Sequence, residues 1–99
     1  MEGYEFGILI NMNTRKIEKL TKGIANHRRV QIMDLLDRTP NLSVIAVADE
    51  LNVNFKTISE HLRRLTFAEL VMKRNMGNEV QHALSPRGKY TLKFLRTLE

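Results

Sequence analysis

Two short amphipathic segments joined by only three residues constrain the fold of this chain more than any other feature of its sequence. The segment 44–51 follows Ser43, a residue type that often caps helices, and repeats apolar residues at helical spacing. The segment 55–68 carries an apolar stripe at i, i+4 and i+7, formed by Ile58, Leu62 and Leu65. The two are joined by Asn52-Val53-Asn54, where either asparagine can adopt left-handed backbone or cap the next helix. We therefore predict a helix-turn-helix unit over residues 43–68.

Upstream of this unit the periodicity predicts three further elements, in order a short strand over residues 4–12, a helix over residues 14–25 and a helix over residues 27–38. Asn13 or Thr14 can cap the first helix and Asn26 the second, because short polar side chains accept hydrogen bonds from the free amides at a helix start. The second helix is ended by Thr39-Pro40-Asn41.

Downstream, apolar segments around turn residues 75–78 predict a β-hairpin over residues 70–84. An N-cap and a proline suited to the first helical position are supplied by Ser85-Pro86, so a last helix runs over residues 86–98. Helix, helix, helix-turn-helix, hairpin, helix is the order of a winged-helix domain. We therefore predict a mainly α fold with a small β-hairpin (α+β), a winged helix-turn-helix domain that occupies residues 1–99 as a single unit.

The composition excludes several classes of protein. The 99 residues include no cysteine, which excludes a disulfide framework, a thiolate metal site and thiol catalysis. No apolar run approaches the length of about 18 residues that a membrane span needs. The start, Met1-Glu2-Gly3-Tyr4-Glu5, is acidic where a signal peptide needs a basic flank. We therefore expect a cytoplasmic protein.

The positive charge is concentrated in the second half of the chain. The net charge is +5, and between residues 54 and 96 there are nine basic and three acidic side chains. Such a surplus predicts a polyanionic partner, although charge alone fits RNA, DNA or an acidic protein equally well.

Three stretches of the sequence resemble one family of regulators. Residues 54–65 resemble the recognition helix of ArsR-type and related archaeal and bacterial winged-helix regulators, whose pattern is a capping polar residue followed by Thr-Val/Ile-Ser-x-His-Leu-x-x-Leu. Residues 25–36 resemble the family's Ala-Asn-Pro-x-Arg-x-x-Ile-Leu-x-Leu-Leu, and residues 84–88 resemble the junction between hairpin and last helix in winged-helix proteins. The resemblance covers roughly residues 17–98 and implies a winged-helix fold that binds DNA.

The sequence departs from the family's pattern at two positions. His27 replaces the usual proline, which should only weaken the start of a helix. Glu69 replaces the glycine of an Ala-Gly-Leu-Val turn, and a non-glycine residue in left-handed backbone costs about 1–2 kcal/mol, so this turn is either strained or differently shaped. Metal-sensing relatives use clusters of Cys and His/Asp that this sequence lacks. We therefore expect no metal site and no cofactor.

The helix over residues 55–68 carries the candidate base contacts, because four of its side chains point away from the apolar stripe. Lys56 can reach guanine acceptors, Ser59 can donate or accept, and Glu60 can accept from a cytosine amino group. Phe55 either contacts a thymine methyl or packs against the preceding helix, because an aromatic residue at a helix start is often part of the core.

Phosphate contacts are expected from residues at both ends of the same helix. Asn54 and Thr57 suit phosphate oxygens, although helix capping explains Asn54 at least as well. Arg63 and Arg64 would meet the backbone on the groove wall, where the alternative is a solvated helix face. The interpretation of the chain as a regulator requires that both arginines are free of internal ion pairs and that the helix is not covered by a partner subunit.

Lys73 and Arg74 begin the hairpin, whose tip would lie near the minor groove or its phosphates. A hairpin that is merely solvated is the alternative for this pair. All ten candidate DNA-binding residues therefore lie between residues 54 and 74.

Apolar side chains in excess of one small core predict a homodimer. The last helix places Tyr90, Phe94 and Leu98 on one line, and the segment over residues 1–25 adds further apolar residues, namely Phe6, Ile8, Ile10, Ile17 and Leu20. These side chains either complete the core of a monomer or form a two-fold interface made by the N-terminal segment and the helix over residues 86–98.

No catalytic site is indicated, so we expect a protein that is not an enzyme. His27, His61 and His82 share no metal-ligand spacing, and no acidic residue has a nucleophile or paired base in sequence reach. His61 is expected to be partly buried and hydrogen-bonded within the domain.

These observations favour a sequence-specific regulator of transcription that binds double-stranded DNA as a homodimer. Its recognition helix, residues 55–68, would lie in the major groove, and occupying a promoter makes repression the simplest mode of regulation. The alternative is a winged-helix module that binds another protein in a transcription-related complex. Measuring how duplex binding depends on salt separates the two.

Overall fold

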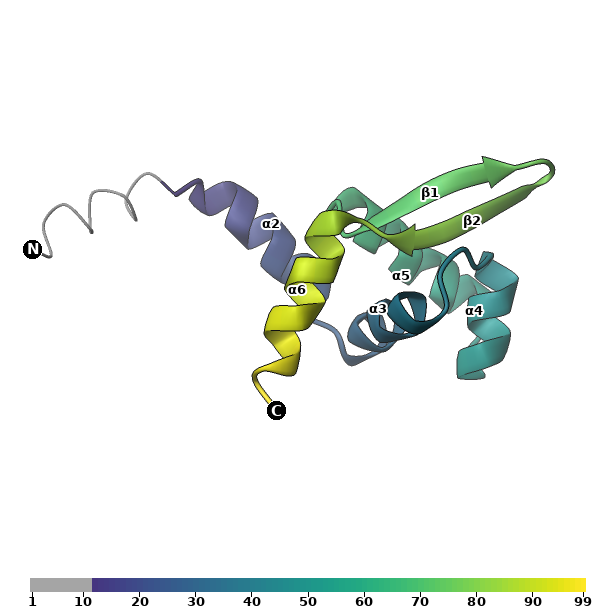
Figure 1. Cartoon of the computed structure of the whole chain (residues 1–99), viewed down its shortest axis with the longest axis horizontal. Coiled ribbons are helices and arrows are strands. Elements are labelled where there is room, and N and C mark those ends of the chain that lie inside the picture. Colours follow the sequence, from purple (N-terminus) through teal and green to yellow (C-terminus); the bar gives the residue numbers. More distant parts are fainter. Residues whose placement is uncertain (1–11) are drawn as a thin grey trace, which may run out of the picture.

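The computed structural model describes residues 12–99, and within them five helices and one hairpin follow the order that the sequence predicts (Figure 1). In order they are α2 (Thr14–Ile24), α3 (His27–Arg38), α4 (Val44–Leu51), α5 (Phe55–Phe67), β1 (Val71–Met76), β2 (Glu79–Leu84) and α6 (Pro86–Arg96). The mainly α fold with a small hairpin is confirmed. The strand predicted over residues 4–12 lies, except for its last residue, outside the described residues. No helix in the described part of the chain is long and apolar enough to cross a membrane.

Each of the five helices within residues 12–99 begins at a polar side chain that accepts hydrogen bonds from the first free amides of the helix. The capping residues are Asn13, Asn26, Ser43, Asn54 and Ser85, where the sequence allows Thr14 as well as Asn13, and for Asn54 either a cap or a left-handed turn residue. Asn26, for example, accepts from the amides of Arg28 and Arg29 at 2.9 and 3.2 Å. These caps satisfy donors that would otherwise lack partners, and so fix where each helix starts.

The core lies around α3, which contacts α2, α5, α6 and β2. Its largest fully buried side chains are Ile32, Met33, Leu36, Val47, Ile58, Leu62, Leu65 and Leu70. The predicted stripe of α5 is therefore buried, and the opposite face of that helix is turned to solvent. At the turn between α4 and α5, Asn52 adopts left-handed backbone with φ 55°, as its residue type allows.

The hairpin is held to the body at its base and extends away from it toward the tip (Figure 1). Val71 pairs with Leu84 at the base, and both side chains are buried. His82 and Leu42 exchange backbone hydrogen bonds of 2.8 and 3.1 Å, which attach β2 to the loop before α4. At the tip the strands continue to a two-residue turn, where Gly77 adopts a φ of 66° that side chains rarely tolerate.

The turn between α5 and β1 has the strained backbone that was one of the two alternatives for Glu69. Glu69 has left-handed backbone with φ 63°, so this turn keeps a conformation for which glycine is the preferred residue. The carbonyl oxygen of Glu69 accepts a hydrogen bond of 2.7 Å from the hydroxyl of Ser85, and its carboxylate lies 3.2 Å from Arg87. The base of the hairpin is thus tied to the start of α6 through a residue in an unfavourable conformation.

We expect Glu69→Gly to raise the free energy of unfolding by about 1 kcal/mol, because glycine removes the clash that a Cβ atom causes in left-handed backbone. Glu69→Ala is the matched control, since it also removes the carboxylate near Arg87 but keeps the Cβ atom. Urea unfolding of the three proteins measures the difference. A glycine variant no more stable than the alanine variant would show that this backbone is not strained.

Candidate nucleic-acid interface

The solvent-facing side of α5 carries most of the candidate DNA-binding residues. Lys56, Thr57 and Glu60 are exposed, and Ser59 is half-buried beside the buried stripe. Phe55 is 53% exposed, so it lies outside the buried core, and this exposure is compatible with both a base contact and packing against the preceding helix. The interpretation of Phe55 as a contact residue on the surface therefore remains a prediction.

Asn54 acts as a helix cap. Its side-chain oxygen accepts hydrogen bonds from the backbone amides of Lys56 at 2.7 Å and Thr57 at 3.3 Å. The structure therefore shows Asn54 in the role of a helix cap, one of the roles that the sequence allows for it. Its effect on a nucleic acid would be indirect, because the cap sets the first turn of α5 from which Lys56 and Thr57 project.

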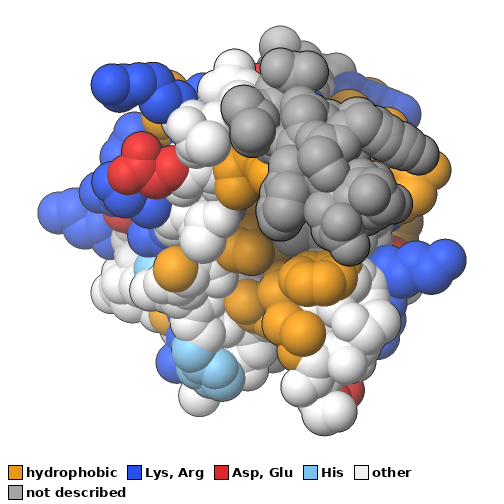
Figure 2. Space-filling view, turned by 90° about the vertical axis from the view of Figure 1, so that its left-hand side faces the viewer, with side chains coloured by type: hydrophobic (Ala, Val, Ile, Leu, Met, Phe, Trp, Pro, Cys, Tyr) orange, Lys and Arg blue, Asp and Glu red, His pale blue; other side chains and the backbone are white. Residues whose placement is uncertain are grey.

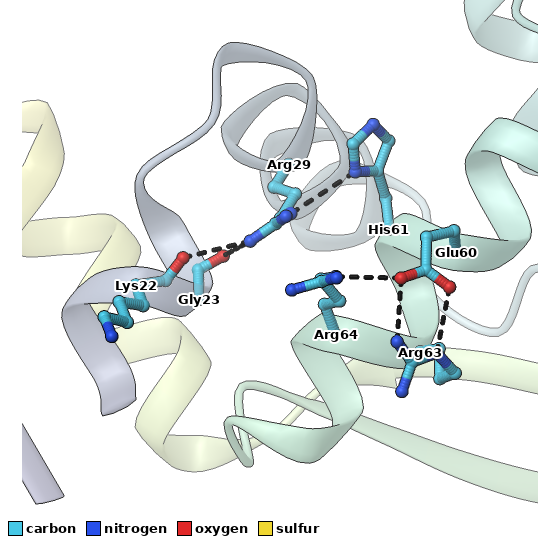
Figure 3. Close-up of polar contacts among 7 residues, drawn as sticks. All are labelled: Lys22, Gly23, Arg29, Glu60, His61, Arg63 and Arg64. Carbon is cyan, nitrogen blue, oxygen red and sulfur yellow. Dashed lines mark hydrogen bonds and ion pairs between the residues drawn. The ribbon is translucent and has the colours of Figure 1, made fainter. Parts of the chain in front are cut away.

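Glu60 forms ion pairs with both arginines that were predicted to meet phosphates (Figure 3). Arg63 donates from Nε and a terminal nitrogen to the two carboxylate oxygens at 2.9 and 2.7 Å, and Arg64 donates from Nε at 2.8 Å. The hydrogen bonds from Arg63 and then Arg64 lower the pKa of Glu60 to about 2. Glu60 is therefore ionised at neutral pH, and the three side chains together keep one net positive charge.

The requirement that both arginines be free of internal ion pairs is thus not met. The sequence contained the signal, because carboxylates and guanidinium groups three and four residues apart lie on one face of a helix. Both arginines nevertheless stay at the surface, with side chains 62% and 54% exposed. All three groups belong to α5, so these pairs join α5 to no other element.

Arg29 lies on α3 and connects α5 to the last turn of α2, a role for which the sequence carries no signal (Figure 3). Its Nε donates to Nδ1 of His61 at 3.3 Å, and a terminal nitrogen donates to the carbonyls of Lys22 and Gly23 at 3.0 and 3.2 Å. His61 is half-buried and hydrogen-bonded within the domain, as predicted. Burial lowers the pKa of His61, and the positive charges of Arg29 and Arg28 lower it further.

Because the pKa of His61 is lower in the folded state than its ordinary 6.5, protonation opposes folding. The contribution of His61 to stability is therefore complete above pH 6.5 and is lost as the pH falls through the folded-state pKa. We expect an NMR titration to give His61 a pKa below 6.5, and Arg29→Gln to raise it, because the variant removes a neighbouring positive charge.

His82 is the control within the same spectrum. Its pKa is lowered by burial first and by Lys73 to a smaller extent, while its Nδ1 lies 3.0 Å from the carbonyl of Leu42. Arg29→Gln should leave the pKa of His82 where it is. If the pKa of His61 also stays unchanged in this variant, the charge of Arg29 is not one of the causes that lower it.

Lys73 and Arg74 lie on β1, opposite His82 and Gln81, and both are exposed. Successive side chains of a strand point to opposite faces. A hairpin lying flat on a surface would therefore present only one of the two, whereas a hairpin entering a groove would present one to each wall.

The end of the molecule that carries α2 and α6 has a large exposed apolar surface (Figure 2). On α6, Tyr90, Phe94 and Leu98 are 77%, 60% and 66% exposed, while Leu92 on the opposite face is buried. Ile17 on α2 is 43% exposed. The described residues therefore do not use this line of α6 in the core of the monomer, which was the alternative to an interface.

No group of three or more possible ligand side chains that could hold a metal ion occurs between residues 12 and 99. The three histidines of the chain are accounted for separately, with His61 bonded to Arg29 and His82 to Leu42. His27 lies exposed at the start of α3.

Comparison with known proteins places this arrangement among bacterial regulators. Residues 26–73 match the model of the bacterial regulatory protein, arsR family. No protein with a curated description matches the chain.

Several solved structures are similar over most of their length. Reduced HlyU from Vibrio cholerae is 33% identical, with a TM-score of 0.74 and coverage of 87% of this chain and 90% of that one. The transcriptional regulator HlyU from Vibrio vulnificus is 30% identical, with a TM-score of 0.73 and coverage of 99% and 98%. The homodimeric winged helix-turn-helix DNA-binding domain of Mb0332 from Mycobacterium bovis is 26% identical, with a TM-score of 0.79 and coverage of 86% and 79%.

Proposed function

The chain belongs to the ArsR family of winged-helix, DNA-binding transcriptional regulators, which are not enzymes, and we propose that it represses transcription as a homodimer with α5 in the major groove of DNA. One observation carries this proposal. The apolar stripe of α5 is buried, so the helix turns its polar side, with Lys56, Arg63 and Arg64, to solvent. A helix of this kind fits the width of the major groove.

We assign the base contacts to the first turns of α5. Lys56 would reach guanine acceptors, Ser59 would donate or accept, and Phe55 would contact a thymine methyl. Thr57 would lie near a phosphate oxygen at the helix start, and Asn54 would contribute through the cap that sets the position of Thr57. Lys73 and Arg74 of β1 would contact the backbone beside the minor groove.

The ion pairs of Glu60 are compatible with phosphate binding by the arginines. Surface pairs within one helix contribute little to stability, because water and salt screen them. A phosphate can therefore replace Glu60 as the partner of Arg63 or Arg64 at small cost, and the carboxylate released by that exchange could then accept from a cytosine amino group. Glu60 thus holds both guanidinium groups on the DNA-facing side of α5 before binding.

Dimerisation is proposed through the N-terminal segment, residues 1–25, and through α6. The support is the exposed line of Tyr90, Phe94 and Leu98, together with the homodimeric state of the similar domain from Mycobacterium bovis. Two copies related by a two-fold axis would place their α5 helices in successive major grooves, about one helical turn of DNA apart. A palindromic site is the expected target.

Arg63→Ala or Arg64→Ala should weaken binding to every duplex and flatten its salt dependence, because each change removes a phosphate contact from both subunits. If each subunit neutralises four or five phosphates, the slope of log K against log salt is about −8, and either variant should reduce its magnitude by about 1.8. Fluorescence anisotropy with a duplex selected from a random pool, at several salt concentrations, measures both quantities.

Arg38→Ala is the matched control, because Arg38 lies on α3 and pairs with Asp34 at 3.1 Å rather than with α5. By contrast, Lys56→Ala should relax the preference for particular bases, by about 1–3 kcal/mol. Binding that is independent of salt, or equal in the unmodified protein and all four variants, would favour the alternative of a winged-helix module that binds another protein.

Phe94→Ser should shift the protein toward monomer, because it places a hydroxyl in the middle of the proposed apolar interface. The fold should persist, since Phe94 is 60% exposed and makes no part of the core. Lys93→Ser is the control on the neighbouring exposed position of α6. Sedimentation equilibrium measures the dissociation constant of the dimer. If the Phe94→Ser protein is still fully dimeric, the interface does not include this line of α6.

A further inference from the structure

A pocket of about 260 Å³ lies between α2, the start of α3 and the end of α5. Five cationic side chains and an aromatic ring line it, namely Arg15, Lys19, Lys22, Arg29, Arg64 and Phe67. Its volume is near the lower end of pockets that hold small molecules, which is about 300 Å³. Of its lining, Arg64 belongs to the face of α5 proposed to meet phosphates and α2 belongs to the segment proposed for dimerisation, but no function above is assigned to the pocket as a ligand site.

The positive charge in the pocket is poorly balanced. Its one carboxylate, Glu18, already pairs with Lys22 at 3.3 Å. Within residues 12–99, neither Arg15 nor Lys19 takes part in an ion pair. An anion placed here would relieve repulsion among the lining cations, since like charges this close oppose one another.

Arg29 and Arg64 both line the pocket, and their like charges oppose each other. The pKa of Arg29 is lowered by burial and then by the charge of Arg64. Figure 3 shows the guanidinium group of Arg29 on the carbonyls of Lys22 and Gly23, and that of Arg64 joined to Glu60. Glu60 therefore reaches Arg64 but makes no hydrogen bond with Arg29.

Phe67 gives the pocket an aromatic surface. The ring of Phe67 is 67% exposed, and the ammonium group of Lys19 lies 4.1 Å from its centroid. α2 approaches α5 closely here, because a Cβ atom on Gly23 would lie 2.6 Å from that of Ala68. A second flat group could stack on Phe67 while Lys19 and Arg15 meet a negative charge.

We propose that this pocket binds a small amphipathic anion, a carboxylate or phosphate attached to a flat apolar group, and that its binding lowers the affinity of the protein for DNA. The effect on DNA, which rests on the proposed function, follows from the position of Arg64. This residue lines the pocket and also belongs to the face of α5 assigned to phosphates. An anion beside Arg64 cancels part of the charge that attracts the duplex, and competes for the guanidinium group itself.

Binding is tested on the full chain without DNA, by following backbone amide resonances as 2-naphthoate is added. We expect saturable shifts at Lys19, Gly23 and Phe67, and none of similar size with the neutral analogue 2-naphthalenemethanol. Shifts confined to the exposed line of α6, or equal shifts with both compounds, would overturn the assignment of the site.

Lys19→Gln and Phe67→Ala should each weaken binding of 2-naphthoate by about fivefold, because one removes a cation and the other the stacking surface. Both positions are exposed, so the fold should be unaffected. Lys16→Gln removes the same charge from the same helix but does not line this pocket, and should change the affinity by less than about twofold. Equal affinities in Lys19→Gln and Lys16→Gln would refute the role of the pocket.

The effect on DNA is measured as duplex affinity with saturating 2-naphthoate, against sodium acetate at the same concentration. We expect the dissociation constant to rise about fivefold in the unmodified protein and to stay unchanged in Lys19→Gln. If 2-naphthoate binds but the duplex affinity does not change, the regulatory role is wrong while the site stands. If the protein binds no duplex under any condition, the proposed function fails, and the titration without DNA still decides whether the pocket takes the anion.

Discussion

The packing of α5 against α3 is the contact on which the rest of the structure depends. Ile58, Leu62 and Leu65 are at most 1% exposed, which fixes the rotation of α5 about its own axis. That rotation decides which side chains reach solvent, because residues on a helix share a face only at intervals of three or four. The same contact places the start of α5 at the surface and its end beside α2. The candidate interface and the basic pocket are therefore two consequences of one apolar stripe.

Most of the fold could be predicted because its signals are local. Apolar periodicity, five capping residues and the turn residue Gly77 each act within a few positions of the chain, and the structure has the elements where these signals put them. For the turn at Glu69 the sequence allows either a strained left-handed backbone or a turn of another shape. It does not say which, because packing decides whether an unfavourable backbone conformation is kept. The buried stripe, the hairpin and the attached α6 hold it in the left-handed conformation.

The candidate site was less predictable, because its charges interact with one another and with distant residues. The positions of Lys56, Arg63 and Arg64 on the exposed face follow from periodicity alone. The pairing of both arginines with Glu60 has a sequence signal, but spacing cannot show that one carboxylate engages two partners at once. The bond between Arg29 and His61 spans 32 positions and had no local signal. The proposed interface on α6 would involve a second copy of the chain, whose placement no local pattern in the sequence encodes.

The attachment of the hairpin has a consequence for how the protein can be modified. Only its base is held to the body, through Val71, Leu84 and the backbone bonds between His82 and Leu42. The strands beyond that base carry exposed side chains, and the tip closes in a two-residue turn. Extra residues inserted after Gly77 would lengthen the projecting arm without disturbing any buried contact. The chain has no native cysteine, so a single cysteine placed there would carry a fluorescent reporter at a unique position.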